Sequence, residues 1–275
     1  MDSGSAIPKV VPPLPRPNPR ARDLPARTAG QWLGAGWRDL RTDPLPSLIY
    51  GLAVFLLSAF VVWGMFRYEV DYFFLPSLSG FLVLGPLIAA GLYEKSRRLE
   101  KGEGTGLSSM VFVRPASRYQ AVFLGLILLL LFMLWQRAAF LLLALHMGVR
   151  PFAGFEDILP MIFTTWMGWS LLITGTIIGG LFAAFAFAIS VFAMPMMLEE
   201  RTDALTAMGI SMALVWNNLR VMLIWGMIVV GLFALALLTG LLGLIVIFPV
   251  LGHATWHAYR DIRSSRGERV FFRPE

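Results

Sequence analysis

The sequence contains no cysteine, and only 15% of its 275 residues are charged. The absence of cysteine excludes disulfide bonds, catalytic thiolates and cysteine-ligated metals from this chain. A water-soluble domain carries about a quarter charged residues, so the low charge content argues that lipid surrounds most of the polypeptide. Glycine-rich phosphate loops, nucleophile motifs and pairs of carboxylates within apolar runs are also missing. We therefore expect a non-enzymatic protein.

Long apolar runs take the place of the missing charge. Hydrophobic residues make up 57% of the chain, and the mean hydropathy is +0.70. Several runs reach the length of about 18 residues that a helix needs to cross a membrane. A spanning β-barrel would show alternating segments of about ten residues instead. The sequence predicts an all-α, polytopic membrane protein.

Composition divides the chain into four parts. Residues 1–30 form a proline-rich basic arm, which we expect to be disordered and cytoplasmic. Residues 31–45 are expected to form an amphipathic helix on the membrane surface. Residues 46–259 hold the transmembrane domain, and residues 260–275 form a basic cytoplasmic tail.

The helix expected at 31–45 has an apolar face made by Leu33, Trp37 and Leu40. Tryptophan prefers the membrane–water interface because its ring is apolar and its N–H is polar. Trp32 and Trp37 are therefore the expected interface anchors.

Six transmembrane helices are expected, arranged as three hairpins. Their ranges are 46–65, 74–93, 120–146, 169–194, 219–238 and 241–259. Twenty of the 23 lysines and arginines lie on one side of these helices, and the exceptions are Arg67, Arg137 and Arg150. Basic residues are enriched on the cytoplasmic side. Both termini are thus expected in the cytoplasm of a bacterial inner membrane, which requires an even number of crossings.

Prolines and glycines predict where these helices bend and pack. Pro86, Pro195 and Pro249 each lie in the inward half of an even-numbered helix, where proline removes a backbone hydrogen bond and kinks the helix. Small residues spaced four apart allow close approach of two helices. On this basis Gly175, Gly179 and Gly180 are expected to pack the fourth helix tightly against its neighbours.

Arg137 follows a long apolar run and has two interpretations. A charge in the middle of the bilayer is costly and usually functional. However, about 20 residues separate Arg137 from Arg118, and such a length already crosses the hydrocarbon layer. Arg137 is then a residue of the outer interface, and the segment 138–148 lies along the outer surface or projects above it.

His253 and His257 lie four residues apart on the sixth helix. This spacing places two imidazoles on one face and could supply two metal ligands. Packing of polar side chains at the interface is the alternative. No cofactor is predicted, because the remaining histidine, His146, lies toward the opposite side and cannot complete a bis-histidine haem site.

Two junctions between apolar and basic residues mark the expected cytoplasmic interface. One ends the second helix and the other ends the sixth. Their residues are Tyr93, Glu94, Arg97, Arg98, Trp256, Tyr259 and Arg260. The net charge of +6 gathers beside apolar helices, so the expected partners are anionic lipid head groups and other membrane subunits, and not nucleic acid.

Several short motifs resemble an uncharacterised family of proteobacterial inner-membrane proteins with six spans. The motifs are Pro76-x-x-x-Gly80, Gly85-Pro86, Gly91-Leu-Tyr-Glu-x-Ser-Arg97-Arg-x-Glu-x-Gly102, Pro195-Met-x-Leu and Gly252-His-Ala-Thr-Trp-His-Ala-Tyr-Arg260. Members of this family are often labelled as related to cytochrome c oxidase subunit I. The resemblance covers about residues 35 to 265, and it implies a location and a topology without implying an activity.

The expected function is that of an accessory or assembly subunit of a larger membrane complex, with respiratory complexes among the candidates. An apolar bundle with conspicuous junctions and no evident chemistry of its own motivates this hypothesis. The alternative is a small-molecule or lipid transporter, because proline-broken helices are common in transport pathways.

Overall fold

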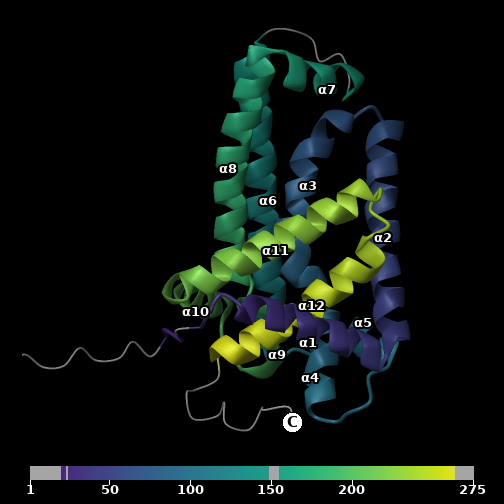
Figure 1. The fold of residues 1–275 in the computed structure, drawn as a ribbon, viewed down its shortest axis with the longest axis vertical. Helices are drawn as coiled ribbons and strands as arrows, with labels where there is room; N and C mark the ends of the chain where they lie inside the picture. Colours follow the sequence, from purple (N-terminus) through teal and green to yellow (C-terminus); the bar gives the residue numbers. More distant parts are fainter. Residues whose placement is uncertain (1–19, 23, 149–154, 264–275) are drawn as a thin grey trace, which may run out of the picture.

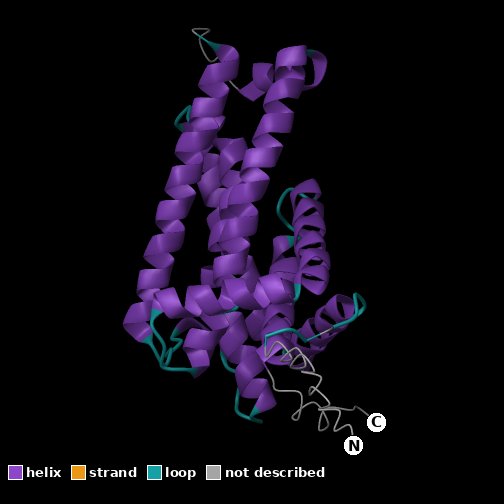
Figure 2. Ribbon diagram, turned by 90° about the vertical axis from the view of Figure 1, so that its left-hand side faces the viewer, coloured by secondary structure: helices purple, strands orange, loops and turns teal. Residues whose placement is uncertain are grey.

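The computed structural model describes residues 20–22, 24–148 and 155–263. These residues form helices joined by short turns, and no strand occurs among them (Figures 1 and 2). The predicted all-α, polytopic membrane fold is confirmed. Five of the helices are long and apolar enough to cross a membrane.

Four upright helical columns run from the upper end of the molecule toward its lower end (Figure 1). They are α2 (Pro44–Arg67), α3 (Phe74–Ile88) with its continuation α4 (Ala90–Glu100), α6 (Arg118–Met147), and α8 (Trp166–Ser190) with its continuation α9 (Ala193–Glu199). The continuations α4 and α9 lie at the lower end. The short helix α7 (Phe155–Thr164) lies across their upper end. The 3-10 turn η1 (Asp71–Phe73) joins α2 to α3.

The remaining helices lie toward the opposite end, which we call the basal end (Figures 1 and 2). They are α1 (Thr28–Thr42), α5 (Leu107–Val111), α10 (Ala204–Asn217), α11 (Leu219–Leu238) and α12 (Leu244–Arg263). Every described lysine and arginine of the predicted cytoplasmic set belongs to this end of the fold. Arg20 and Arg22 are anchored here by Asn218 and by the carbonyl of Ile262. The arm predicted for residues 1–30 is therefore ordered over residues 20–22 and 24–30, with α1 beginning at Thr28, and residues 1–19 and 23 lie outside the described part.

Local sequence explains where several helices begin and end. Pro44 occupies the first turn of α2, where a missing backbone N–H costs nothing. Thr165 caps α8 by accepting a hydrogen bond from the Gly168 N–H at 3.0 Å. Asp203 caps α10 through the Thr206 N–H at 2.9 Å. The helix α8 begins at Trp166, three residues before the start predicted for the fourth helix at residue 169.

The three predicted prolines act differently. Pro86 breaks its helix as expected, because α3 ends at Ile88 and α4 begins at Ala90. The break between α8 and α9 precedes Pro195, which lies in the first turn of α9. Pro249 does not interrupt α12, which runs without a break from Leu244 to Arg263.

Glycine allows α12 to contact two neighbours at backbone distance. A Cβ on Gly51 of α2 would lie 2.2 Å from the Ile245 carbonyl oxygen, the group that Pro249 leaves without its usual helical donor. A Cβ on Gly36 of α1 would lie 2.6 Å from both the Ala254 nitrogen and the Val250 oxygen. Only glycine permits these approaches, so α1 and α2 are fixed against α12.

The hairpin of α11 and α12 is shallower than the other two. Ile245, at the start of α12, lies against Gly51 in the lower half of α2. Both helices cross the upright columns obliquely, and the turn between them lies well below the upper end of α2 (Figure 1). The three predicted hairpins are therefore not equivalent. Both described ends of the chain nevertheless lie at the basal end, as an even number of crossings requires.

The face of α1 differs from the predicted one. Trp32 is buried against Trp225, with ring centroids 6.0 Å apart, and its N–H donates to Asp261. Leu40 is also buried, whereas Trp37 is exposed and lies beneath the Arg41 guanidinium. Trp32 therefore anchors α1 to the bundle and not to the membrane interface. The buried face of α1 includes Ala29, Trp32 and Gly36, which are spaced three and four residues apart.

The upper ends of the columns are staggered. The Trp135 N–H of α6 donates to the Pro76 carbonyl at 3.0 Å, and the Gln136 amide donates to the Ser77 hydroxyl at 2.9 Å. The first turn of α3 is therefore level with residue 136 of α6. The rest of α6 rises about 16 Å higher, beside the start of α8 (Figure 1). We call residues 137–147 and 160–173 the projection.

Arg137 is exposed at the base of the projection, level with the turn between α2 and α3. This position agrees with the interpretation of Arg137 as an interface residue. The alternative of a charge buried inside the bundle is wrong. The helix α6 also continues straight through 138–147, so this segment projects above the turn and does not lie flat.

The packing of α1 against α12 can be tested with two glycines of one helix. We expect Gly36→Ala to destabilise the protein by about 1–3 kcal/mol, because the methyl group meets backbone atoms that cannot move aside. A Cβ on Gly34 would have no atom within 4 Å, so Gly34→Ala should stabilise α1 by about 0.5–1 kcal/mol. Thermal unfolding of both full-length variants in mild detergent measures the difference. Equal midpoints for the two variants would show that α1 does not pack on α12 in this way.

Candidate functional site

Six polar side chains from four helices meet beneath α2, and we call them the basal polar cluster. Asp39 comes from α1, Ser47 from α2, Lys95 and Ser96 from α4, and His253 and His257 from α12. Ser47, Lys95, Ser96 and His253 have no exposed surface. Gly36 of α1 and Gly51 of α2 allow these helices to approach α12 closely. The imidazoles of His253 and His257 on α12 therefore lie among these groups.

The buried imidazole of His253 is bound at both nitrogens. Its Nε2 lies 3.0 Å from the Ser47 hydroxyl, and its Nδ1 lies 2.8 Å from the Ser96 hydroxyl. Lys95 donates to the Ser47 hydroxyl at 2.8 Å and also to the Asp43 carbonyl. Ser96 donates to the Asp39 carboxylate at 2.6 Å. A continuous chain of hydrogen bonds thus runs from Lys95 to Asp39.

Lys95 and Asp39, at the two ends of this series of hydrogen bonds, set the direction of every bond in it. An ammonium group only donates, and a carboxylate only accepts. Lys95 therefore donates to Ser47, and Ser47 donates to Nε2 of His253. Nδ1 then carries the proton and donates to Ser96, which donates to Asp39. This network assigns the tautomer of a neutral His253, and both imidazole nitrogens have a partner.

The carboxylate of Asp39 also accepts a hydrogen bond from His257, whose Nε2 lies 2.8 Å away. Burial alone would raise the pKa of Asp39, but the hydrogen bond and charge of His257, the Ser96 hydroxyl and the nearby His253 lower it more. The net effect is a pKa below the usual aspartate value. Asp39 and His257 are the partly exposed end of the cluster.

The burial of the cluster limits its chemistry. Serine, histidine and carboxylate in hydrogen-bond contact resemble the parts of a nucleophilic site. However, the Ser47 hydroxyl has no exposed surface, and Lys95 closes its other side. A substrate cannot reach it in this arrangement. The cluster is suited to joining α1, α2, α4 and α12 through satisfied polar contacts.

His253 and His257, the two histidines that were predicted as metal ligands, have different hydrogen-bond partners. Both nitrogens of His253 are already in hydrogen bonds, and Nε2 of His257 contacts Asp39. Within residues 20–22, 24–148 and 155–263, no group of three or more potential ligands forms a metal site. The contacts instead match the alternative interpretation of polar packing, and a metal bound by His253 and His257 stays an untested prediction.

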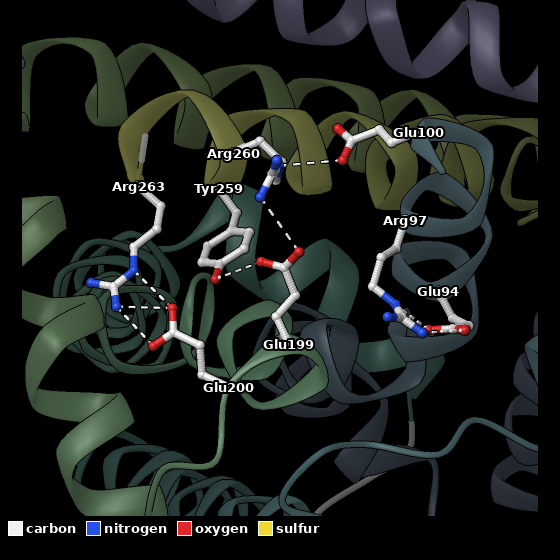
Figure 3. Close-up of polar contacts among 8 residues, drawn as sticks. All are labelled: Glu94, Arg97, Glu100, Glu199, Glu200, Tyr259, Arg260 and Arg263. Atoms are coloured by element: carbon white, nitrogen blue, oxygen red, sulfur yellow. Dashed lines mark hydrogen bonds and ion pairs between the residues drawn. The ribbon is translucent and has the colours of Figure 1, made fainter. Parts of the chain in front are cut away.

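A second group of charges joins α4, α9 and α12 beside the cluster (Figure 3). Arg260 of α12 lies 3.3 Å from Glu100 and 3.4 Å from Glu199. Tyr259 donates to Glu199 at 3.1 Å, and Arg263 pairs with Glu200 at 2.8 Å. These charges form a basal ion-pair network that ties the ends of three helices together.

The residues predicted at the cytoplasmic interface meet at this end of the fold, but they are not equally accessible. Tyr93, Trp256 and Tyr259 are buried in the core. Glu94 is nearly buried and pairs with Arg97 at 2.8 Å and with Arg98 at 3.4 Å. Arg260 is half-exposed. Most of these side chains therefore stabilise the chain itself and leave little surface for a partner.

Four members of the cluster, Asp39, Ser47, Lys95 and Ser96, were not predicted as site residues. Lys95 was counted as one of several basic loop residues, because the second helix was expected to end at Tyr93. The helix α4 continues to Glu100 and turns Lys95 and Ser96 inward. The juxtaposition of Ser96 with a histidine 157 positions later is a tertiary contact, and no local pattern signals it.

The three glycines that were predicted to pack the fourth helix closely have different surroundings. A Cβ on Gly179 would lie 2.8 Å from the Trp135 ring, so the predicted close contact exists there. Gly175 and Gly180 have nothing within 4 Å of such a Cβ. The packing prediction therefore holds for Gly179 and fails for Gly175 and Gly180, which face open space.

Comparison with known proteins supports the membrane assignment. Residues 73–199 match a family model described as "Predicted integral membrane protein (DUF2189)". No curated protein and no solved structure matches the chain. The match runs from η1 to α9 and includes Lys95 and Ser96, whereas Asp39, Ser47 and His253 lie outside it. The similarity supports an uncharacterised membrane-protein family, and the chain is a multi-pass membrane protein.

The charge on Asp39 can be tested through the pH dependence of stability. Because the folded pKa of Asp39 is lowered, its stabilising effect is complete above the unfolded pKa of about 3.9 and is lost as the pH falls through the folded pKa. We expect Asp39→Asn to lower the unfolding midpoint at pH 7. We also expect the difference from wild type to shrink as the pH falls below about 4.

The exposed pair of Arg98 and Glu103 provides the control. Glu103→Gln should change stability by less than about 1 kcal/mol. Unfolding of the three full-length proteins in detergent between pH 7 and pH 3 measures both effects. A difference between Asp39→Asn and wild type that does not vary with pH would contradict the assigned role of the carboxylate.

Proposed function

We propose that this protein is a non-enzymatic accessory or assembly subunit of a larger complex in a bacterial inner membrane, with both termini in the cytoplasm. The distribution of basic residues supports this orientation, because the described members of the large basic set lie at the basal end. The proposal is carried by one observation, the exposed apolar surface of the projection.

Exposed aromatic residues suggest where the membrane ends. Trp63, Phe66 and Tyr68 are exposed at the upper end of α2, and Trp37 and Tyr119 are exposed near the basal end. Tryptophan and tyrosine gather at the two interfaces of a membrane. The length of α2 from residue 45 to residue 66 is about 32 Å, which matches a hydrocarbon core of about 30 Å.

The projection rises above this upper boundary and remains apolar. Leu145 of α6 is 80% exposed and Trp166 of α8 is 86% exposed, and Leu141 and Phe163 are also exposed. An apolar patch of this kind is unfavourable in water and is typical of a surface that another protein covers. An apolar surface on a neighbouring membrane subunit is the partner that fits it.

The partner surface can be tested with two aromatic sites of equal exposure. We expect Trp166→Ala, combined with Leu145→Ala, to abolish co-purification of the partner subunit from native membranes in mild detergent. Tyr119→Ala is the matched control, because Tyr119 is 87% exposed at the basal end. It should leave co-purification unchanged.

The absence of cysteine in the sequence allows a second measurement. We expect Leu145→Cys to be protected from a membrane-impermeant maleimide in native membranes and to react after purification away from the partner. Leu126→Cys, within the lipid-facing part of α6, should stay unreactive in membranes. Equal reaction of Leu145→Cys before and after purification, in a monodisperse protein without a partner, would refute the proposal.

The competing function is transport of a lipid or small molecule. A pocket in the upper half of the bundle favours it. Below that pocket, however, Leu124, Leu128 and Ala186 of α6 and α8 are fully buried. A transporter needs access from both sides of the membrane. Flux in proteoliposomes that is lost on altering Pro86 or Arg137 would favour transport over the accessory role.

A further inference from the structure

A pocket of about 470 Å³ lies between α3, α6 and α8. It is bordered by Ile162 of α7 and by Val230 of α11. Its volume is within the range of about 300–1,000 Å³ that is typical of small-molecule sites. The proposed accessory role assigns no ligand to it.

The pocket is elongated along the helices. Its wall includes Leu75, Ser79 and Leu82 of α3, which are spaced three and four residues apart, and Leu172 and Ala183 of α8. Residues at such spacing form one stripe along a helix. From Leu172 to Ala183 the stripe is about 16 Å long. A pocket of this shape fits a linear chain better than a compact ring.

The lining of the pocket is apolar, and no lining residue is ionisable. Two of its polar side chains donate hydrogen bonds to neighbouring residues, whereas the Gln136 Oε1 is buried without a hydrogen-bond partner among the described residues. Ser79 donates to the Pro76 carbonyl at 2.6 Å, and the Gln136 amide donates to Ser77. A ligand in this pocket therefore contacts mainly carbon atoms and gains free energy from apolar contact.

Two glycines leave the space open. Nothing lies within 4 Å of a Cβ placed on Gly175 or Gly180, and both residues line the pocket. Any larger residue at these positions would fill part of the volume. The small side chains of α8 thus create a cavity on this face, whereas Gly179 on the same helix makes the contact with Trp135.

We propose that this pocket holds one acyl chain of a membrane phospholipid. A cavity of about 150 Å³ accepts one benzene molecule of six carbons, so the observed volume corresponds to a chain of about 18 carbons. The pocket begins in the projection, at Leu143 and Leu172, and its middle part is level with the turn between α2 and α3, where head groups lie. The lower part reaches Val230 within the apolar layer. In a phospholipid, the polar head would lie at the head-group level and the straight acyl chain would lie in the apolar layer.

The experiment uses the full-length protein, purified in mild detergent, stripped of lipid and then incubated with 1-palmitoyl-2-oleoyl-phosphatidylglycerol. Native mass spectrometry counts the phospholipids that remain bound. We expect wild type to retain one phospholipid, and Gly180→Leu and Gly175→Leu to lose it, with affinity at least tenfold lower. Gly64→Leu is the control, because Gly64 of α2 also has nothing within 4 Å and lies away from the pocket.

The variants should fold, since leucine has a higher helix propensity than glycine by about 0.8–1 kcal/mol. Thermal unfolding should show midpoints for Gly175→Leu and Gly180→Leu at or above that of lipid-free wild type. Equal phospholipid retention by all four proteins would overturn the proposal. So would an isoprenoid, and not a phospholipid, as the molecule that extraction of the native protein recovers and that Gly180→Leu releases.

Discussion

The buried imidazole of His253 is the contact on which the rest of the basal end depends. A polar group in an apolar interior is costly unless each hydrogen-bonding atom has a partner. Ser47 of α2 and Ser96 of α4 bind its two nitrogens. Gly36 and Gly51 bring α1 and α2 close enough to α12 for these contacts to form. Loss of either serine hydroxyl would leave one nitrogen of the buried imidazole without a hydrogen-bond partner.

The two ends of the molecule differ in how completely they are packed. At the basal end, charges and hydroxyls are paired within the chain, and Tyr93, Trp256 and Tyr259 fill the core. At the upper end, α8 borders an open pocket, and the projection carries exposed apolar side chains. The proposed lipid and partner contacts therefore lie at the less completely packed end.

Periodicity and charge predicted much of this architecture, because both are local properties. The helix α11 coincides with the predicted range 219–238, and the basic residues gather at one end as expected. Which glycines pack closely was not predictable in the same way. Gly36 has no small residue four positions away, and Gly51 has only Ser47, so their role depends on where α12 lies. These tertiary contacts fix the position of α12 against α1 and α2.

A double-mutant cycle on Ser47→Ala and Ser96→Ala tests the central role of His253 most directly. The two serines belong to different helices and share the imidazole between them. Unfolding free energies of wild type, both single variants and the double variant give the coupling. If His253 joins the helices, the coupling should exceed about 1 kcal/mol, as it does for residues of one hydrogen-bond network. Effects that add to within about 0.5 kcal/mol would show that the two serines act independently and would contradict this account.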